Sequence, residues 1–269
     1  MSLEAAYAEC ARITREQGPN FSVGFEVLPE AKRRAVQASY AFCRLADDLV
    51  DEPAVRDDPA RLLAQWREEL AAVYAGRARH PVGRALADAV RRYPIPRRSF
   101  EDLIRGCEQD LHFEAPAGLA AVRRYCDLVA TPIGEMSLAI FGGVRARLAP
   151  LARHLAHAFQ WTNMLRDVRE DHERGRIYLP ADWLRAEGVP PGDLLAPDAR
   201  AGLMRVVERG VELTREHYEA ARDLPDGVDP DARTTVRLMA GVYREILERI
   251  AQDPTRILHE RVGLAEHEK

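Results

Sequence analysis

The 269-residue sequence lacks several features that would assign it to a common class of protein. Its 39 basic residues are outnumbered by 43 acidic ones, so no overall positive charge attracts nucleic-acid phosphates. No apolar run approaches the length of a membrane span, and the N-terminal stretch mixes charged residues into its apolar ones. The cysteines form no C-x-x-C pair, which argues against a zinc cage or a disulfide framework and favours a reducing compartment. We therefore expect a cytoplasmic protein with no nucleic-acid partner and no transmembrane segment.

Strand patterns and nucleotide-binding motifs are also missing. No G-x-G-x-x-G occurs, and no alternating apolar pattern indicates a sheet that would hold one. Hydrophobic residues, 46% of the chain, instead recur with helical spacing between short breaks that contain proline or glycine. The predicted helices are 2–17, 30–52, 58–75, 82–92, 97–112, 119–141, 149–173, 200–223 and 229–252. The sequence predicts an all-α fold, a helical bundle forming one domain over residues 1–269.

Acidic residues crowd the end of the predicted helix at 30–52. Tyr40, Arg44, Asp47, Asp48 and Asp51 share one side of it at 3.6 residues per turn, opposite an apolar side. An ordinary amphipathic helix explains this as well, with the charges in water and Arg44 paired with Asp48. However, the acids lie where the helix dipole is already negative, and Asp47 repels Asp51 one turn on. A bound cation would reverse both penalties.

A second polar stripe lies near the end of the predicted helix at 149–173. Its members, at steps of three, four and four, are Gln160, Asn163, Asp167 and Asp171. A solvated helix end is again the simpler alternative, with Arg166 paired with Glu170. Two such arrangements in one helical chain favour a shared role. If the helices face each other, their oxygens can hold Mg²⁺ together with a substrate diphosphate, to which Arg44 and Arg166 can also donate.

At this point the sequence resembles the squalene/phytoene synthase family, the head-to-head prenyl transferases. The resemblance covers about residues 19–262. Its motifs are Tyr40-Ala-Phe-Cys-Arg44, Asp47-Asp48-x-x-Asp51, Gln160-x-x-Asn163-x-x-Arg166-Asp167-x-x-x-Asp171 and Gly175-Arg176-x-Tyr178-Leu179-Pro180. It implies a bundle around a central substrate channel, in which two allylic diphosphates are joined through a cyclopropyl intermediate with Mg²⁺ on paired aspartate motifs.

The resemblance also implies a role for each matching residue. The implied metal ligands are Asp47, Asp48, Asp51, Asn163, Asp167 and Asp171. The implied catalytic residues are Arg44 and Arg166, which bind diphosphate, Tyr125, which assists proton handling or cation guidance, and Tyr40. Phe21, Gln160 and Tyr243 are implied to line the substrate site. Aromatic rings suit this chemistry because their faces attract a carbocation, although most aromatic residues in a bundle only pack its core.

Two short sequence motifs indicate which substrate is used. Asn20-Phe21 and Thr131-Pro132 are more similar to bacterial hopanoid-linked, squalene-forming members, which favours two farnesyl diphosphates and a product that is presqualene diphosphate, hydroxysqualene or squalene. The closest alternative is a phytoene synthase that uses two geranylgeranyl diphosphates. NADPH is not supported by the sequence. Pro132 is expected to kink the helix at 119–141, because proline removes a helix hydrogen bond.

Other classes of protein fit less well. Terpene cyclases and head-to-tail synthases also place acids around Mg²⁺, but Asn163, Asp167 and Asp171 match neither pattern. A non-catalytic helical scaffold or lipid carrier would keep the bundle and leave its acidic stripes unused. An apolar substrate can also bring the protein to a bilayer surface transiently. The sequence predicts no particular oligomeric state.

Overall fold

The computed structural model describes residues 2–51, 58–265 and 268. Every regular element in these residues is helical, which confirms the all-α prediction. The elements are α1 (Leu3–Gln17), α2 (Pro19–Glu26), α3 (Glu30–Asp51), α4 (Pro59–Tyr74), α5 (Pro81–Arg92), α6 (Arg97–Leu111), α7 (Leu119–Val129), α8 (Thr131–Phe141), α9 (Arg145–Arg166), α10 (Val168–Glu173), α11 (Ala181–Ala186), η2 (Pro191–Asp193), α12 (Arg200–Ala220), α13 (Leu224–Gly227), α14 (Arg233–Gln252) and η3 (Pro254–Leu258).

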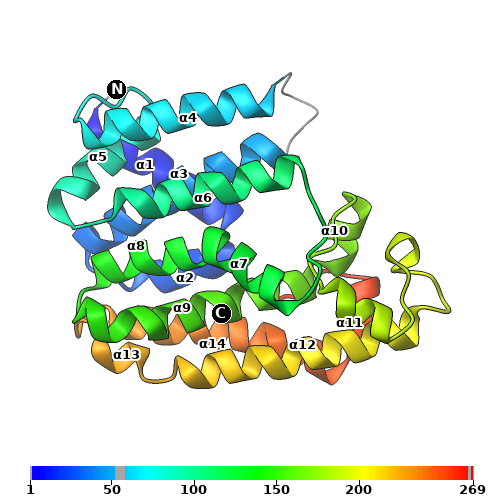
Figure 1. Ribbon diagram of the computed structural model, residues 1–269. Helices are drawn as coiled ribbons and strands as arrows, with labels where there is room; N and C mark the ends of the chain where they lie inside the picture. Colours follow the sequence, from blue (N-terminus) through cyan, green and yellow to red (C-terminus); the bar gives the residue numbers. More distant parts are fainter. Residues whose placement is uncertain (1, 52–57, 266–267, 269) are drawn as a thin grey trace.

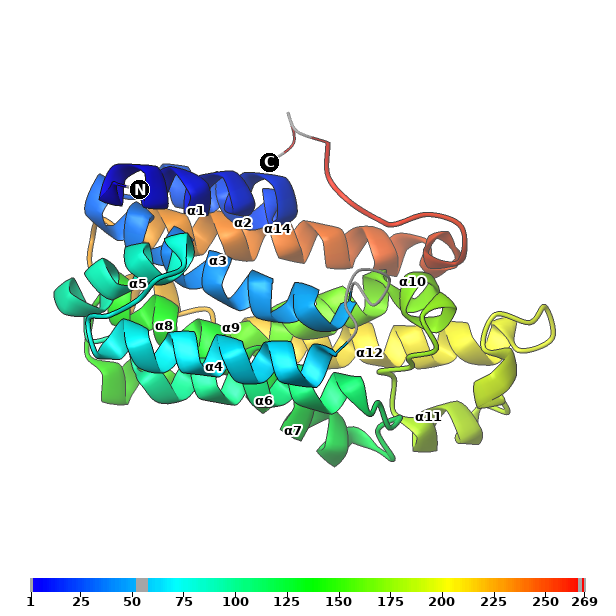
Figure 2. The ribbon, with the colours of Figure 1, turned by 90° about the horizontal axis from the view of Figure 1, so that it is seen from above.

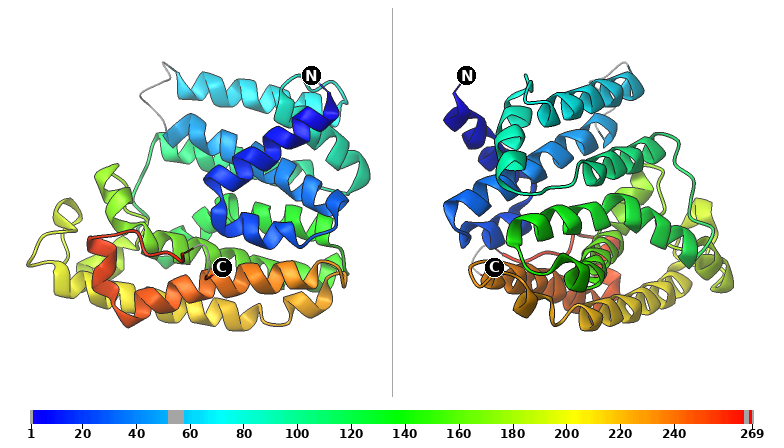
Figure 3. Two further views of the ribbon diagram at one scale, coloured as in Figure 1. Left: turned by 180° about the vertical axis from the view of Figure 1, so that it is seen from behind. Right: turned by 60° about the vertical axis from the view of Figure 1, so that its left-hand side comes forward.

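Most of the long helices run across the molecule in the same general direction, with α4 on one side and α9, α12 and α14 on the other (Figure 1). Helix α1 crosses the outside of the bundle and packs on α3 and α5 (Figure 3). After α14 the chain turns at η3 and passes beside α10 (Figure 2). Within the residues described, no helix combines the length and apolar character needed to cross a bilayer.

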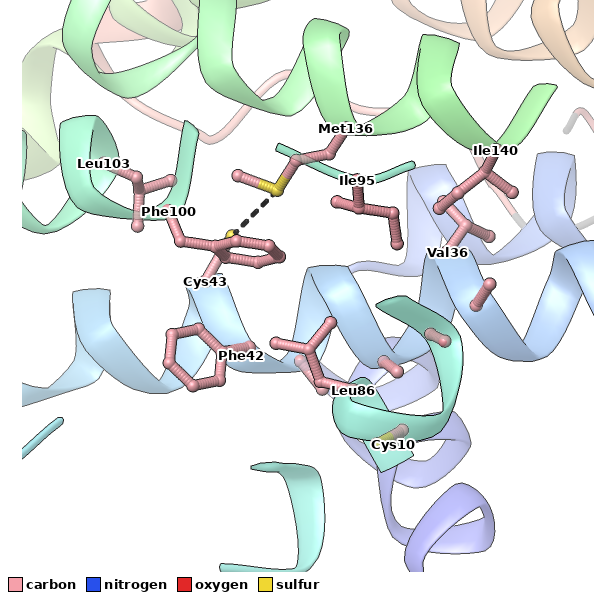
Figure 4. Close-up of a cluster of buried hydrophobic side chains, with 14 of the residues drawn as sticks. Cys10, Val36, Phe42, Cys43, Leu86, Ile95, Phe100, Leu103, Met136 and Ile140 are labelled. Atoms are coloured by element: carbon pink, nitrogen blue, oxygen red, sulfur yellow. Dashed lines mark hydrogen bonds between the residues drawn. The ribbon is translucent and has the colours of Figure 1, made fainter. Parts of the chain in front are cut away.

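Two clusters of buried apolar side chains hold the helices together. The first draws mainly on α1–α6 and α8, and Figure 4 shows its centre, where the Cys43 thiol lies 3.9 Å from the Met136 sulfur. The second draws mainly on α7, α9, α11, α12 and α14. Phe21, Leu155 and Phe159 pack against both clusters and line a cavity, which therefore lies between the two cores.

The prediction of a single helix at 119–141 is wrong in one respect, because the structure has two helices in this range. Helix α7 ends at Val129 and α8 begins at Thr131, with Ala130 as the cap of both. Pro132 lies in the first turn of α8, where its missing N–H has no helical partner to lose. The proline therefore starts a new helix rather than kinking a continuous one.

Other helix boundaries also differ from the prediction. The helix predicted at 149–173 begins at Arg145, continues through Pro150 and ends at Arg166, and α10 follows after Asp167. The predicted break at Gly18-Pro19 is followed at once by α2, which Pro19 begins because proline is pre-set for the first helical turn. Helices α11 and α13 were also missed, and α14 begins at Arg233 rather than at residue 229.

Candidate functional site

The cavity between the two cores has a volume of about 720 Å³, in the range of small-molecule sites. It is lined by almost every site residue that the sequence singled out, namely Phe21, Tyr40, Arg44, Asp47, Asp48, Tyr125, Gln160, Asn163, Arg166, Asp167, Asp171 and Tyr243. Asp51 ends α3, and its side chain lies outside the described residues. Helix spacing predicted the two polar stripes, and the structure shows that α3 and the α9–α10 segment present them to one cavity.

The α3 side of the cavity carries an arginine between two acids. The Arg44 guanidinium lies 3.0 Å from a carboxylate oxygen of Asp47 and 2.5 Å from one of Asp48. Burial lowers the pKa of Arg44, but the two carboxylates outweigh it and leave the pKa above its ordinary value. The pairing of Arg44 with Asp48 is thus present, although it lies on a cavity wall with Asp48 only 6% exposed, and not on a solvated face.

The opposite side is built around Asp167, at the junction of α9 and α10. Arg166 binds this carboxylate through Nε at 2.7 Å and through Nη2 at 2.5 Å. Arg261, which follows η3, binds it at 2.9 Å and lies 3.6 Å from Glu170. Burial raises the pKa of Asp167, but the hydrogen bonds from Arg166 and Arg261 outweigh it and the pKa is lowered, so the carboxylate is ionised at neutral pH.

Arg261 is a cavity residue that the sequence did not single out. It lies 94 residues from Asp167, with no helical spacing to connect the two. The expected partner of Arg166 was Glu170, one turn on. In the structure Arg166 binds Asp167 instead, because the helix breaks at that residue.

One buried side-chain oxygen on the cavity wall has no hydrogen-bond partner among the described residues. This atom is Oδ1 of Asn163. The buried Nε of Arg44 also lacks a hydrogen-bond partner. An unsatisfied buried polar group costs about 1–3 kcal/mol, so its presence calls for an explanation, and a bound ion is one. An amide oxygen beside carboxylates is a donor set that suits Mg²⁺.

The donor set fits a metal that is shared with its substrate. Within the described residues, no three histidine, cysteine or acidic side chains gather closely enough to hold a metal ion unaided. Mg²⁺ commonly keeps several waters and binds through one or two carboxylates plus substrate phosphates. The carboxylates of α3 and of the α9–α10 segment, with Asn163, meet that smaller requirement.

Aromatic rings that line the cavity form a contiguous group. The Phe21 ring centroid lies 5.8 Å from that of Tyr40, 5.1 Å from that of Tyr243 and 6.0 Å from that of Phe159. Burial raises the pKa values of Tyr40 and Tyr243, so both remain neutral phenols. Phe159 was missed in the sequence, although it follows Leu155 by one turn on the cavity face of α9. A side chain at Gly18, where α1 turns into α2, would overlap the Tyr40 hydroxyl and would require the Tyr40 ring to shift.

Tyr125 belongs to a separate polar cluster that the sequence did not reveal. It stacks on Tyr178 at 4.9 Å, and the hydroxyl groups of both residues donate to Asp110 at 3.1 Å. Burial and the nearby Asp110 carboxylate raise the pKa of Tyr125 well above its ordinary value. Asp110 follows Cys107 by one turn and Leu103 by two, at the end of the face of α6 that lines the cavity.

Two solved structures that share this fold define the class of protein to which the chain belongs. The fold is shared with a dehydrosqualene synthase solved in complex with ligand, with a TM-score of 0.86 and 31% identity over 93% of this chain and 87% of that one. It is also shared with squalene synthase HpnC from Alicyclobacillus acidocaldarius, with a TM-score of 0.83 and 30% identity over 93% and 94% of the two chains. These are helical isoprenoid synthases.

Residues 14–268 match the sequence profile described as squalene/phytoene synthase. The chain belongs to the squalene/phytoene synthase family and is a prenyltransferase. A phytoene synthase of Arthrospira platensis is 33% identical over 95% of this chain and 87% of its own length. A presqualene diphosphate synthase of Rhodopseudomonas palustris is 34% identical over 86% of this chain and 83% of its own. Head-to-head prenyl condensation is therefore supported for this chain.

Proposed function

We propose that this protein joins two molecules of farnesyl diphosphate head-to-head in a Mg²⁺-dependent reaction that yields presqualene diphosphate, hydroxysqualene or squalene for hopanoid-type isoprenoid synthesis. The observation that carries the proposal is the division of one cavity into a charged end and an aromatic, apolar remainder. That division matches a substrate with a diphosphate head and a hydrocarbon tail. The four cysteines are free and buried, which supports a reducing compartment such as the cytoplasm.

The charged end would bind the two diphosphates. Asp47, Asp48 and Asp51 on α3 would hold Mg²⁺ together with Asn163, Asp167 and Asp171 across the cavity. The metal supplies positive charge that stabilises a departing diphosphate. Arg44, Arg166 and Arg261 would donate hydrogen bonds to the same anion, because a guanidinium fits phosphate oxygens with two parallel donors.

The aromatic wall would protect the hydrocarbon cation that forms when diphosphate leaves. The rings of Phe21, Tyr40 and Tyr243 present faces that attract positive charge and expose no strong nucleophile. The surrounding apolar side chains keep water away from the reacting carbons. Tyr125, which is protonated and oriented by its hydrogen bond to Asp110, would take part in proton transfer at this site. Gln160 would line the same cavity.

A second candidate function is the condensation of two geranylgeranyl diphosphates. Relatives named phytoene synthase match this chain as well as the relative named presqualene diphosphate synthase does, at 31–34% and 34% identity respectively. Incubating the purified protein with each substrate and Mg²⁺, followed by mass spectrometry of the products, separates the two. We expect C30 products, and a C40 hydrocarbon alone would contradict the farnesyl choice.

Removing one acid from each side of the cavity tests the proposed metal site. Asp47→Asn and Asp167→Asn should each lower kcat at least a hundredfold, roughly the effect of losing one essential electrostatic contact, while circular dichroism shows an unchanged helix content. Asp198→Asn, on an exposed residue outside the cavity, is the matched control and should keep full activity. Undiminished turnover in both cavity variants would show that these acids hold no catalytic metal.

Binding of inorganic diphosphate separates an enzyme from a non-catalytic scaffold. Titration calorimetry should detect binding only when Mg²⁺ is present, and the bound pair should raise Tm because ligands stabilise the folded state. A scaffold or lipid carrier would show no metal-dependent anion binding.

A further inference from the structure

Lys32 is one of only two lysines in the sequence, and it is buried near the start of α3. Its ammonium lies 2.5 Å from a carboxylate oxygen of Asp231, 3.0 Å from one of Asp229 and 3.4 Å from the carbonyl oxygen of Phe141. Burial lowers the pKa of Lys32, but the two carboxylates outweigh it and the pKa stands above its ordinary value. A charge buried in this way needs such partners, because an unpaired one is costly.

The partners of Lys32 belong to the two segments that close the far end of the cavity. Phe141 is the last residue of α8, and the two aspartates lie between α13 and α14. In Figure 1 the turn after α8 and helix α13 lie at one end of the bundle, whereas α10 and the acidic end of α3 lie at the other. Phe141 and Val228, which precedes Asp229, both line the cavity. Lys32 therefore ties both closing segments to α3, at the end opposite the acids.

These two segments are also fitted closely to each other. The backbone N–H of Asp229 donates to the Phe141 carbonyl at 3.1 Å. Gly142 follows with φ of +84°, a backbone conformation that favours glycine, and a side chain there would overlap the Asp229 carboxylate. The turn thus leaves little room for adjustment, so the position of Phe141 depends on what holds Asp229.

We propose that Lys32 is a positioning residue that sets the depth of the cavity and thereby selects the shorter allylic chain. This inference rests on the proposed function. A substrate whose diphosphate binds at the acidic end extends its hydrocarbon tail toward Phe141 and Val228. While Lys32 holds both segments, these side chains form a firm floor. Without its charge, the carboxylates of Asp229 and Asp231 turn to solvent, to which they are already about half exposed, and the floor can move to admit a longer tail.

The test measures kcat/KM for farnesyl and geranylgeranyl diphosphate in each variant. Lys32→Met, which keeps length but not charge, should shift the ratio toward the C20 substrate at least fivefold, and Phe141→Ala should shift it in the same direction. Lys32→Arg, which keeps the positive charge, should keep the wild-type ratio. Arg34→Met is the matched control, since Arg34 lies on the same helix and pairs with Glu4 and Glu30 away from the cavity. Its ratio should not change, and any fall in its Tm reports only the loss of its ion pairs.

A folded Lys32→Met protein with the wild-type ratio would overturn the inference. If that variant does not fold, Asp231→Asn removes one contact from a half-exposed carboxylate, and an unchanged ratio in this protein would overturn it equally. A wild-type protein that consumes neither substrate would instead contradict the proposed function, and the inference would fall with it. An equal shift in Arg34→Met would mean that the ratio reports general loosening rather than the floor.

Discussion

Several charged residues of the cavity pair with one another in the structure. Arg44 binds Asp47 and Asp48, and Asp167 accepts from Arg166 and Arg261. Such pairing keeps buried charges compensated before any ligand arrives. A diphosphate with its metal would bring a complementary set of charges, with phosphate oxygens for the arginines and a cation for the carboxylates. We therefore expect ligand binding to exchange partners without leaving any group of the cavity unpaired.

At the residue scale, Tyr125 is predicted to depend on its position beside Asp110. Tyr125→Phe removes the hydroxyl but keeps the ring and should lower kcat by about a hundredfold, within the usual range for a proton-handling group. Tyr178→Phe should cost less, because Tyr125 keeps its hydrogen bond to Asp110. Steady-state kinetics measures both.

Tyr93→Phe is a suitable control, since Tyr93 lies outside the cavity and should tolerate the change. Full activity in Tyr125→Phe would exclude a proton-handling role for its hydroxyl.

The sequence predicted which site residues share one face of a helix, but it did not predict contacts between side chains that are far apart in the chain. Arg44, Asp47 and Asp48 could be placed on one face because α3 is regular and spacing alone decides which side chains share it. Arg261 and Asp110 meet their partners only through the packing of whole helices, which no local pattern encodes. The resemblance drew attention to Tyr178 as part of a motif without indicating its partner.

At the element scale, the contact between α9 and α12 contains a cluster of histidine side chains. Nδ1 of His154 lies 2.9 Å from Nδ1 of His217, and the His157 ring lies 5.4 Å from that of His217. Helix α7 adds Asp127, 3.0 Å from His157, and α7 and α9 also contribute the positive charges of Arg123 and Arg153. The cluster joins three helices through ionisable side chains.

This cluster predicts an acid-sensitive fold. Burial, with the neighbouring histidines and arginines, lowers the pKa of His217 to about 4, and burial also lowers that of His157. Between the unfolded value of about 6.5 and the folded value, the unfolded chain binds more protons, so the free energy of unfolding falls as pH falls. The stabilisation is complete above about pH 6.5, and its loss levels off near pH 4.

Thermal unfolding between pH 7 and pH 4.5 measures this effect. His217→Phe keeps a ring in place without a titrating group. Because the His217 ring is partly exposed and solvent screens its charge, the substitution should reduce the acid loss by only about 1 kcal/mol, or roughly 2–4 °C in Tm. His112→Asn, at an exposed histidine, should retain the wild-type dependence. An identical pH dependence in His217→Phe would show that other groups destabilise the protein in acid.

Helix boundaries show where local patterns stop being sufficient. The predicted helix at 119–141 had the correct span, but proline can either bend a helix or begin a new one, and only the course of α7 and α8 decides which. Pro150 shows the converse, since α9 continues through it. Short helices such as α11 were missed because six residues carry too little periodicity to recognise.

At the scale of the whole molecule, the cavity exists because two apolar cores meet along it without merging. Helical periodicity predicted which residues share the polar stripes of two helices, but the sequence does not say which helices face each other or how much space remains between them. The family resemblance supplied that part by implying a channel, and the structure places the expected residues around it. The depth of the cavity, and the way in which Lys32 holds the segments that close it, could be recognised only from the tertiary structure.

The most direct test of the account locates the metal. Crystals of the protein grown with Mn²⁺ and inorganic diphosphate would show the metal by its anomalous scattering, because Mn²⁺ shares the preference of Mg²⁺ for oxygen ligands. We predict anomalous peaks between the α3 acids and the Asn163–Asp171 segment, with the diphosphate contacting Arg44 or Arg166. Ordered diphosphate with Mn²⁺ bound elsewhere, or with none, would contradict the claim that opposing acids hold a metal for the leaving diphosphate.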